Sequence, residues 1–321
     1  MNEFRVRYDW SREEVAALYN QPLLKLILEA ASVHRTYHEP GEVQTCMLLS
    51  IKTGGCPEDC AYCAQSVHYS TGIRPHKLME VSEVLEAARQ AKENGATRFC
   101  MGAAWREVRT NRDFEKVLEM IRQVRALGLE VCATLGMLTP EQAQSLKEAG
   151  LTAYNHNLDT SATYYNRIIT TRTYQDRLNT LRAARHAGLK LCTGGILGLG
   201  ETDQDRIELL HTLATFTPHP ESVPINTLVP IAGTPLEDMP PVSIWEIVRM
   251  IATARILMPR TKIRLAAGRE RLSPQEQALC FIAGANSIFI GEKLLTTPNV
   301  EPSSDRALFE LLGLKPMPAH A

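Results

Sequence analysis

Short β-rich runs alternate with amphipathic helical segments along most of this 321-residue chain. Leu, Ile, Val and Ala recur at helical spacing in the longer segments, and Gly95 and Gly128 stand where a predicted helix gives way to the next strand. Eight β-rich runs are found, at 44–52, 97–103, 129–135, 151–157, 189–196, 222–230, 262–267 and 286–290. Helical segments lie between them at 81–94, 113–127, 140–149, 174–187, 203–216, 243–258 and 274–283.

This alternation predicts an α/β fold with parallel strands and right-handed crossovers. Eight units predict a (β/α)8 barrel of the TIM type over residues 44–291, close to the roughly 250 residues typical of that fold. A doubly wound open sheet is the alternative, but no GxGxxG motif opens the first helix. Residues 1–43 are predicted to form an N-terminal helical extension, with a capping box at Ser11. Residues 292–321 are predicted to close the barrel and to end in a frayed, Pro-rich tail.

Charge and hydropathy exclude several classes of protein. Lys and Arg total 35 and Asp and Glu total 36, so there is no basic excess for binding nucleic acid. No run approaches the 18 or so apolar residues of a membrane span, and the first ten residues lack an apolar signal segment. We therefore expect a cytoplasmic protein. In such a protein, eight cysteines favour metal binding or catalysis over disulfides.

Three cysteines, Cys56, Cys60 and Cys63, follow the first predicted strand in the sequence GGCPEDCAYCAQS. A 4Fe–4S cubane needs four ligands, so three thiolates leave one iron open to a substrate. The loop is expected at the C-terminal mouth of the barrel, where active sites of this fold lie. A zinc site with His68 as fourth ligand is the alternative, although zinc sites usually pair two C-x2-C motifs.

The spacing C-x3-C-x-aromatic-C, with Tyr62 as the aromatic residue, is identified as the signature of the radical S-adenosylmethionine (SAM) superfamily. The resemblance implies that the open iron binds the amino and carboxylate groups of SAM. One electron then splits SAM into methionine and a 5′-deoxyadenosyl radical. Tyr62 is accordingly included among the predicted SAM-binding residues.

Three further cysteines lie in the centres of predicted strands: Cys100, Cys132 and Cys192. Each alone is more typical of core packing, but inward side chains of barrel strands converge on one axis. Arg264, in the seventh predicted strand, needs an anionic partner if it is buried, and thiolates of an iron–sulfur cluster supply one. The other two cysteines, Cys46 and Cys280, are predicted to be packing residues.

Over nearly its whole length the chain also resembles the biotin synthase family. The resemblance implies that Cys100, Cys132, Cys192 and Arg264 hold a 2Fe–2S cluster, which supplies sulfur to dethiobiotin. It further implies two SAM molecules per biotin, a one-electron donor such as a flavodoxin, and a homodimer. The rivals are another radical SAM enzyme, such as a hydrogenase-maturation or methylornithine-forming homologue, and a zinc-stabilised binding module.

Polar residues follow the fourth predicted strand in the sequence YNHNLD. Asn155, Asn157 and Asp159 alternate and share one face if the strand continues, whereas His156 is predicted to point away into the core. Amides suit a urea-like ring and a carboxylate suits ribose hydroxyls, although Asn and Asp are also common in turns. By resemblance, Asn155 and Asn226 contact the ureido ring, and Asn157 and Asp159 contact the ribose of SAM.

The remaining predicted contacts rest on resemblance alone. The segment 194–201, GGILGLGE, resembles the part of the superfamily that shapes the adenosyl site, with Ile196 in it. Gly102 and Ala103 occupy the place of the segment that meets the methionine amino group. Arg177 is expected to meet the methionine carboxylate, with Arg172 as the alternative. The substrate carboxylate is expected to meet Thr296 and Thr297.

Overall fold

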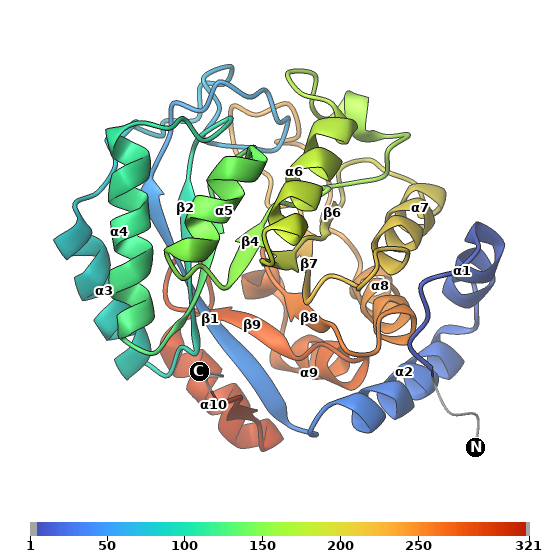
Figure 1. Ribbon diagram of the computed structural model, residues 1–321. Helices are drawn as coiled ribbons and strands as arrows, with labels where there is room; N and C mark the ends of the chain where they lie inside the picture. The colour runs from blue at the N-terminus through green and yellow to red at the C-terminus, as the bar shows by residue number, and fades with distance from the viewer. Residues whose placement is uncertain (1–4, 319–321) are drawn as a thin grey trace.

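Parallel strands close into a barrel in the computed structural model, which describes residues 5–318 (Figure 1). Strand β1 (Glu42–Lys52) pairs with β2 on one side and with β9 on the other, and this pairing closes the sheet. The predicted (β/α)8 barrel is therefore confirmed. The other barrel strands are β2 (Arg98–Ala103), β3 (Glu130–Thr134), β4 (Ala153–Asn155), β5 (Lys190–Cys192), β6 (Gly195–Leu197), β7 (Ser222–Thr227), β8 (Lys262–Leu265) and β9 (Ser287–Ile290).

Helices surround the barrel and follow the predicted segments to within a few residues. Helix α4 illustrates why: Val117, Ile121 and Val124 recur on one face, and all three are buried. The surrounding helices are α3 (Val81–Glu93), α4 (Arg112–Ala126), α5 (Pro140–Glu148), α6 (Tyr174–His186), α7 (Asp203–Ala214), α8 (Ile244–Leu257) and α9 (Pro274–Ile282).

The fifth predicted run, 189–196, is broken into β5 and β6. At the break, a Cβ on Gly194 would lie 2.0 Å from the carbonyl oxygen of Pro224, so only glycine allows this close approach of the two backbones. Strand β6 pairs with β7, and its first residue, Gly195, forms an isolated parallel bridge with Asp159.

The N-terminal extension forms two helices outside the barrel, α1 (Arg12–Tyr19) and α2 (Leu23–Tyr37) (Figure 1). The capping box that the sequence predicts at Ser11 is present. The extension is held to α7 and α8, since the Tyr19 hydroxyl donates to Asp203 at 3.0 Å and Arg249 donates to the Gln21 carbonyl at 2.8 Å. Residues 1–4 of the predicted extension lie outside the described residues.

The C-terminal segment differs from the prediction. It contains a helix that was not predicted, α10 (Pro302–Leu312), and a short strand, β10 (Lys315–Pro316). Strand β10 pairs in parallel with the start of β1, and the Met317 amide donates to the Val43 carbonyl at 2.9 Å. The predicted fraying is therefore wrong for residues 315–317, while residues 319–321 lie outside the described residues.

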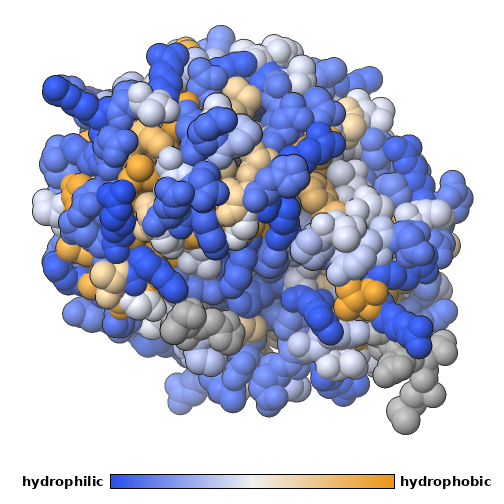
Figure 2. Space-filling model, in the orientation of Figure 1, coloured by the Kyte–Doolittle hydropathy of each residue, from blue (hydrophilic) through white to orange (hydrophobic). Residues whose placement is uncertain are grey.

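Hydrophilic side chains cover most of the face shown in Figure 2, and hydrophobic ones appear there in small scattered groups. Over residues 5–318, no helix combines the length and apolar character needed to cross a membrane.

Candidate active site

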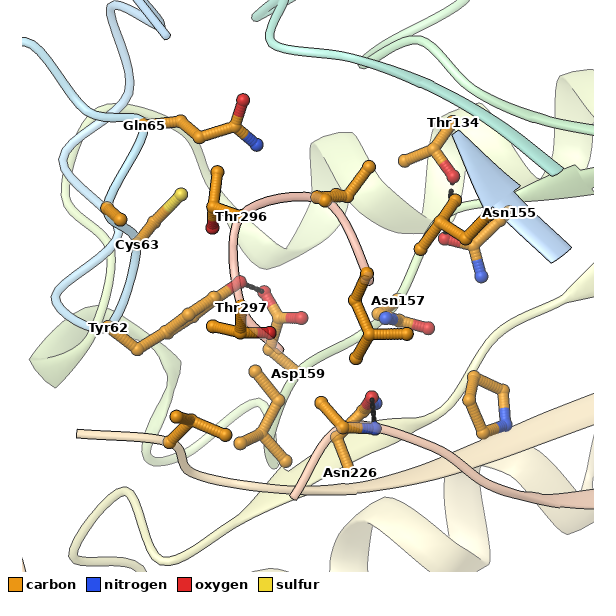
Figure 3. A pocket seen from close by; sticks show the side chains of 18 of the residues that line it. Tyr62, Cys63, Gln65, Thr134, Asn155, Asn157, Asp159, Asn226, Thr296 and Thr297 are labelled. Atoms are coloured by element: carbon orange, nitrogen blue, oxygen red, sulfur yellow. Dashed lines mark hydrogen bonds between the residues drawn. The ribbon is translucent and has the colours of Figure 1, made fainter. Parts of the chain in front are cut away.

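A cavity of about 320 Å³ is lined by residues of both predicted cysteine groups. Figure 3 shows Cys63 of the first group beside polar residues of the cavity. Tyr62 and Cys63 line it from the loop after β1. Cys100 and Cys132 line it from β2 and β3, and Arg264 lines it from β8. Two groups that are far apart in the sequence thus face the same space.

The loop after β1 folds back on itself around the first cysteine group. Gly54 and Gly55 adopt positive φ angles of 69° and 68°, which allow the sharp turn that leads into Cys56. The Cys56 amide donates to the Gln65 carbonyl at 2.9 Å, and the Cys63 amide donates to the Cys60 carbonyl at 2.9 Å. These bonds hold the cysteines of one short segment close together in space.

Burial raises the pKa of the Cys60 thiol to about 11 and that of the Cys63 thiol to about 12. Without a bound cation, both side chains are therefore neutral thiols near pH 7. Arg172 Nη2 lies 4.0 Å from the Cys60 sulfur. Iron replaces the thiol protons when it binds, so these cysteines fit a metal cluster that supplies its own positive charge.

The zinc alternative finds no support in the geometry. His68 Nε2 lies 3.1 Å from the Pro57 carbonyl oxygen, at the exposed side of the loop. Among residues 5–318, no three His, Cys, Asp or Glu side chains converge as ligands of a single metal ion. A polynuclear cluster does not need such convergence, because it distributes its cysteines over several irons.

The second cysteine group lies inside the barrel. Cys100 and Cys132 are direct neighbours in the register of β2 and β3. Cys100, Cys132 and Cys192 pack together in one buried cluster. Arg264 Nη1 lies 3.5 Å from the Cys192 sulfur. The structure thus brings together the four residues predicted to hold a 2Fe–2S cluster.

Cys46 of β1 also belongs to this inner group. It is fully buried, and its sulfur lies 3.2 Å from Arg264 Nη2. Packing alone, as predicted for Cys46, does not describe this contact. For Cys280 the predicted packing role is confirmed, because this residue is buried in α9 within the main hydrophobic core.

The YNHNLD residues connect the two cysteine groups. Asn155 Nδ2 lies 3.2 Å from the Cys192 sulfur, and Asn157 Oδ1 accepts a hydrogen bond from the Gly194 amide at 3.2 Å. Asp159 accepts a hydrogen bond from the Tyr62 hydroxyl at 2.9 Å. Asp159 has a φ of 67°, a left-handed conformation that turns the chain at the end of this segment. All three side chains line the cavity (Figure 3).

The two arginines after β4 have different surroundings. Arg177 is buried; it pairs with Asp159 and donates to the Tyr165 hydroxyl at 2.7 Å. Arg172 lies 3.5 Å from Glu58, and its Nε has no hydrogen-bond partner among the described residues. Both side chains line the cavity, so both are placed to meet an anionic group there.

The other predicted contacts fall on or beside the cavity. Asn226 lines it, although its amide donates to the Gly195 carbonyl at 3.0 Å and accepts from the Ala267 amide at 3.2 Å. Gly102 does not line the cavity, but a Cβ there would lie 2.5 Å from a Leu295 methyl group. The remaining predicted residues line the cavity: Ala103, Ile196, Thr296 and Thr297.

Comparisons with known proteins agree with this geometry. Residues 50–213 match the model of the radical SAM superfamily, and residues 224–315 match the Biotin and Thiamin Synthesis associated domain. The biotin synthase of Cytophaga hutchinsonii is 62% identical over 97% of this chain and 92% of its own length. The mitochondrial biotin synthase of Arabidopsis thaliana is 60% identical over 97% of this chain and 83% of its own length. This chain belongs to the biotin synthase family.

Solved structures support the fold of this family member. A crystal structure of methylornithine synthase has a TM-score of 0.81 at 20% identity, and covers 97% of this chain and 95% of its own. The FeFe-hydrogenase maturase of Carboxydothermus hydrogenoformans has a TM-score of 0.79 at 16% identity, and the match covers 96% of this chain and 76% of that one. The radical SAM barrel is thus shared with enzymes of other names.

One further residue of this biotin synthase family site is His156. The prediction that it points away is wrong, because it lines the cavity and its Nε2 has no hydrogen-bond partner among the described residues. Burial lowers the pKa of His156 well below its usual value, so the imidazole is neutral. The alternation used for the prediction fails because β4 ends at Asn155. Gln65 and Thr134, which also line the cavity, carry no signal in their local sequence.

Proposed function

We propose that this chain inserts sulfur into dethiobiotin to form biotin, as a sulfurtransferase of the radical SAM type. The observation that carries the proposal is one cavity that is lined by Cys63 of the first cysteine group and by Cys100 and Cys132 of the second. A radical formed at the mouth and a sulfur source deeper in the barrel then act on the same enclosed substrate.

In this proposal, Cys56, Cys60 and Cys63 hold a 4Fe–4S cluster at the mouth. When bound, the cluster supplies the electron that cleaves SAM. The protein residues position SAM: Asp159 and Asn157 bind its ribose, and Ala103 lies near its amino group. Pairing with Asp159 fixes Arg177 at the edge of the cavity, where it meets the methionine carboxylate together with Arg172. Tyr62 holds Asp159 in place, and Gly102, packed under Leu295, and Ile196 shape the site.

The inner residues hold the sulfur source. Cys100, Cys132, Cys192 and Arg264 surround a 2Fe–2S cluster, which supplies the sulfur atom when it is bound. Buried thiols from separate strands, together with an arginine aimed at them, suit an anionic cluster. This group has no evident use in an enzyme that only rearranges carbon, which disfavours the methylornithine-forming alternative.

Dethiobiotin lies between the two groups. The Asn155 side chain contacts the Cys192 sulfur, so an ureido ring bound by Asn155 and Asn226 is held beside the sulfur source. Thr296 and Thr297, at the mouth of the cavity, are placed to bind the carboxylate tail (Figure 3). A flavodoxin as electron donor, assembly as a homodimer and a location in the cytoplasm complete the proposal.

An anaerobic assay tests this function. Purified protein with SAM, a one-electron reductant and dethiobiotin should form biotin and 5′-deoxyadenosine together, and omission of dethiobiotin should abolish biotin. Iron with acid-labile sulfide in the purified protein supports the proposal, whereas zinc alone contradicts it. Formation of 5′-deoxyadenosine without biotin, in protein that contains both clusters, would exclude dethiobiotin as the substrate.

A further inference from the structure

We propose that Cys46 is a fourth cysteine ligand of the inner cluster, able to take the coordination position otherwise filled by Arg264. This inference rests on the proposed function, because it concerns the same 2Fe–2S cluster. It adds a residue that neither cysteine spacing nor the resemblance includes.

The first observation is a ring of buried residues inside the barrel. Cys46, Cys100, Cys132 and Cys192 pack together in one buried cluster with Ala153, and Cys100 and Cys132 are direct neighbours in the register of β2 and β3. Arg264 closes the ring, since its two terminal nitrogens lie 3.2 Å from the Cys46 sulfur and 3.5 Å from the Cys192 sulfur. Different terminal nitrogens of Arg264 therefore contact Cys46 and Cys192.

The second observation is how the guanidinium of Arg264 is used. Its Nε donates to Ser287 at 3.0 Å, and Nη2 donates to Gln44 at 3.3 Å as well as to Cys46. A protonated guanidinium has donors only and offers no lone pair to iron. Nor does Arg264 form an ion pair with a carboxylate in residues 5–318. In this protonated form it acts as the counter-ion of the thiolates. To bind iron Arg264 must first lose a proton, and the adjacent Cys46 offers an alternative fourth ligand.

The number of protein ligands that a 2Fe–2S cluster takes also points to Cys46. A 2Fe–2S cluster takes two protein ligands on each iron, and four cysteines are the usual set. Cys46, Cys100, Cys132 and Cys192 all have exposed fractions of 4% or less and form one buried cluster of their own. If Cys46 took this position, its thiol would lose a proton and Arg264, released as guanidinium, would take one up, with no transfer of electrons.

Two buried arginines, Arg98 and Arg264, provide positive charge that would stabilise a fourth thiolate. Arg98 is fully buried and pairs with Cys46 in the register of β1 and β2. Its ion pair with Glu130, at 2.8 Å, offsets part of this charge, but Arg264 adds a second buried cation with no carboxylate beside it. An additional thiolate between these two guanidinium groups is therefore compensated.

Mössbauer spectroscopy of ⁵⁷Fe-enriched, anaerobically purified full-length protein tests the inference, because it counts 2Fe–2S and 4Fe–4S iron separately. Arg264→Met and Cys46→Ala should each keep most of the 2Fe–2S iron, since one fourth ligand remains in each. The double variant should lose roughly tenfold or more of it. Arg264→Met with Cys280→Ala is the matched control, which removes a buried cysteine outside the ring and should keep the cluster.

Two results would overturn the inference. One is loss of 2Fe–2S iron in Arg264→Met as complete as in the double variant. The other is a double variant that retains as much of this iron as Arg264→Met. The 4Fe–4S signal and the melting temperature of each apoprotein show whether a variant folds. Absence of 2Fe–2S iron in the parent protein itself would instead contradict the proposed function.

Discussion

The two cysteine groups of this biotin synthase family member are built in opposite ways. The outer group, Cys56, Cys60 and Cys63, comes from one loop, and burial raises the pKa of each thiol. The inner group comes from separate strands, and buried guanidinium groups lie beside it. In the proposed function, the outer group would leave a cluster one ligand short and open to the cavity, whereas the inner group is enclosed and has buried cations beside it. The first arrangement suits binding of SAM, and the second suits storage of sulfur.

Cys63→Ala should have the largest effect. With two cysteines left, the outer loop should lose its 4Fe–4S cluster, and reductive cleavage of SAM should fall to background. The formation of 5′-deoxyadenosine and the iron content measure this directly. Cys280→Ala, a buried cysteine in α9, is the control and should retain cleavage. Cleavage at the parent rate in folded Cys63→Ala would disprove the assignment of the outer cluster.

Cys132→Ala should separate the two groups by function. The outer loop is unaffected, so the variant should bind SAM and retain some cleavage, but it should make little or no biotin. Truncation in the core can cost about 2 kcal/mol, so circular dichroism and thermal unfolding must first show a folded protein. If this variant made biotin as fast as the parent, the inner cluster could not be the sulfur donor.

Exposure to air should distinguish the groups by enclosure. Cys63 is partly exposed at the cavity and belongs to a cluster with an open iron, whereas Cys132 is 1% exposed. The absorbance of the outer cluster should therefore decay several times faster than that of the inner cluster. Visible spectra and Mössbauer spectra recorded over time measure both rates. Equal rates would contradict the placement of one cluster at the mouth and one inside.

Tyr62→Phe should have the smallest effect. It removes one hydrogen bond to Asp159, worth about 1 kcal/mol, so the Kd for SAM should rise roughly fivefold while both clusters remain. Tyr69→Phe is the matched control, because the Tyr69 hydroxyl bonds the Asp59 carbonyl in the same loop and does not line the cavity. An unchanged Kd in Tyr62→Phe would show that Tyr62 does not position Asp159 for SAM.

Local patterns in the sequence predict the barrel well, because each strand and helix carries its own periodicity. They fail where a distant segment decides the structure. The break after Cys192 depends on how closely Gly194 approaches Pro224, and β10 depends on an edge of β1 that no local signal reveals.

The same distinction applies to the site. The outer cysteines are close in sequence, and their spacing alone predicts one cluster. Cys46 resembles any buried strand cysteine until Arg264, more than two hundred residues later, is seen beside it. The pairing of Arg177 with Asp159 depends in the same way on the packing of a helix against the strand ends.

Strand β1 links the two cysteine groups. It carries Cys46 inside the barrel and ends at Lys52, just before the loop that holds the outer cysteines. At about 3.3 Å per residue, the six steps from Cys46 to Lys52 cover roughly 20 Å. A continuous strand of fixed length therefore sets how far the outer loop lies from Cys46 and the inner cysteines. A one-residue deletion within β1 would turn every later side chain to the opposite face and shift the outer loop. Length changes are consequently far more damaging in this strand than in the connections outside the barrel, so β1 constrains how the enzyme can evolve.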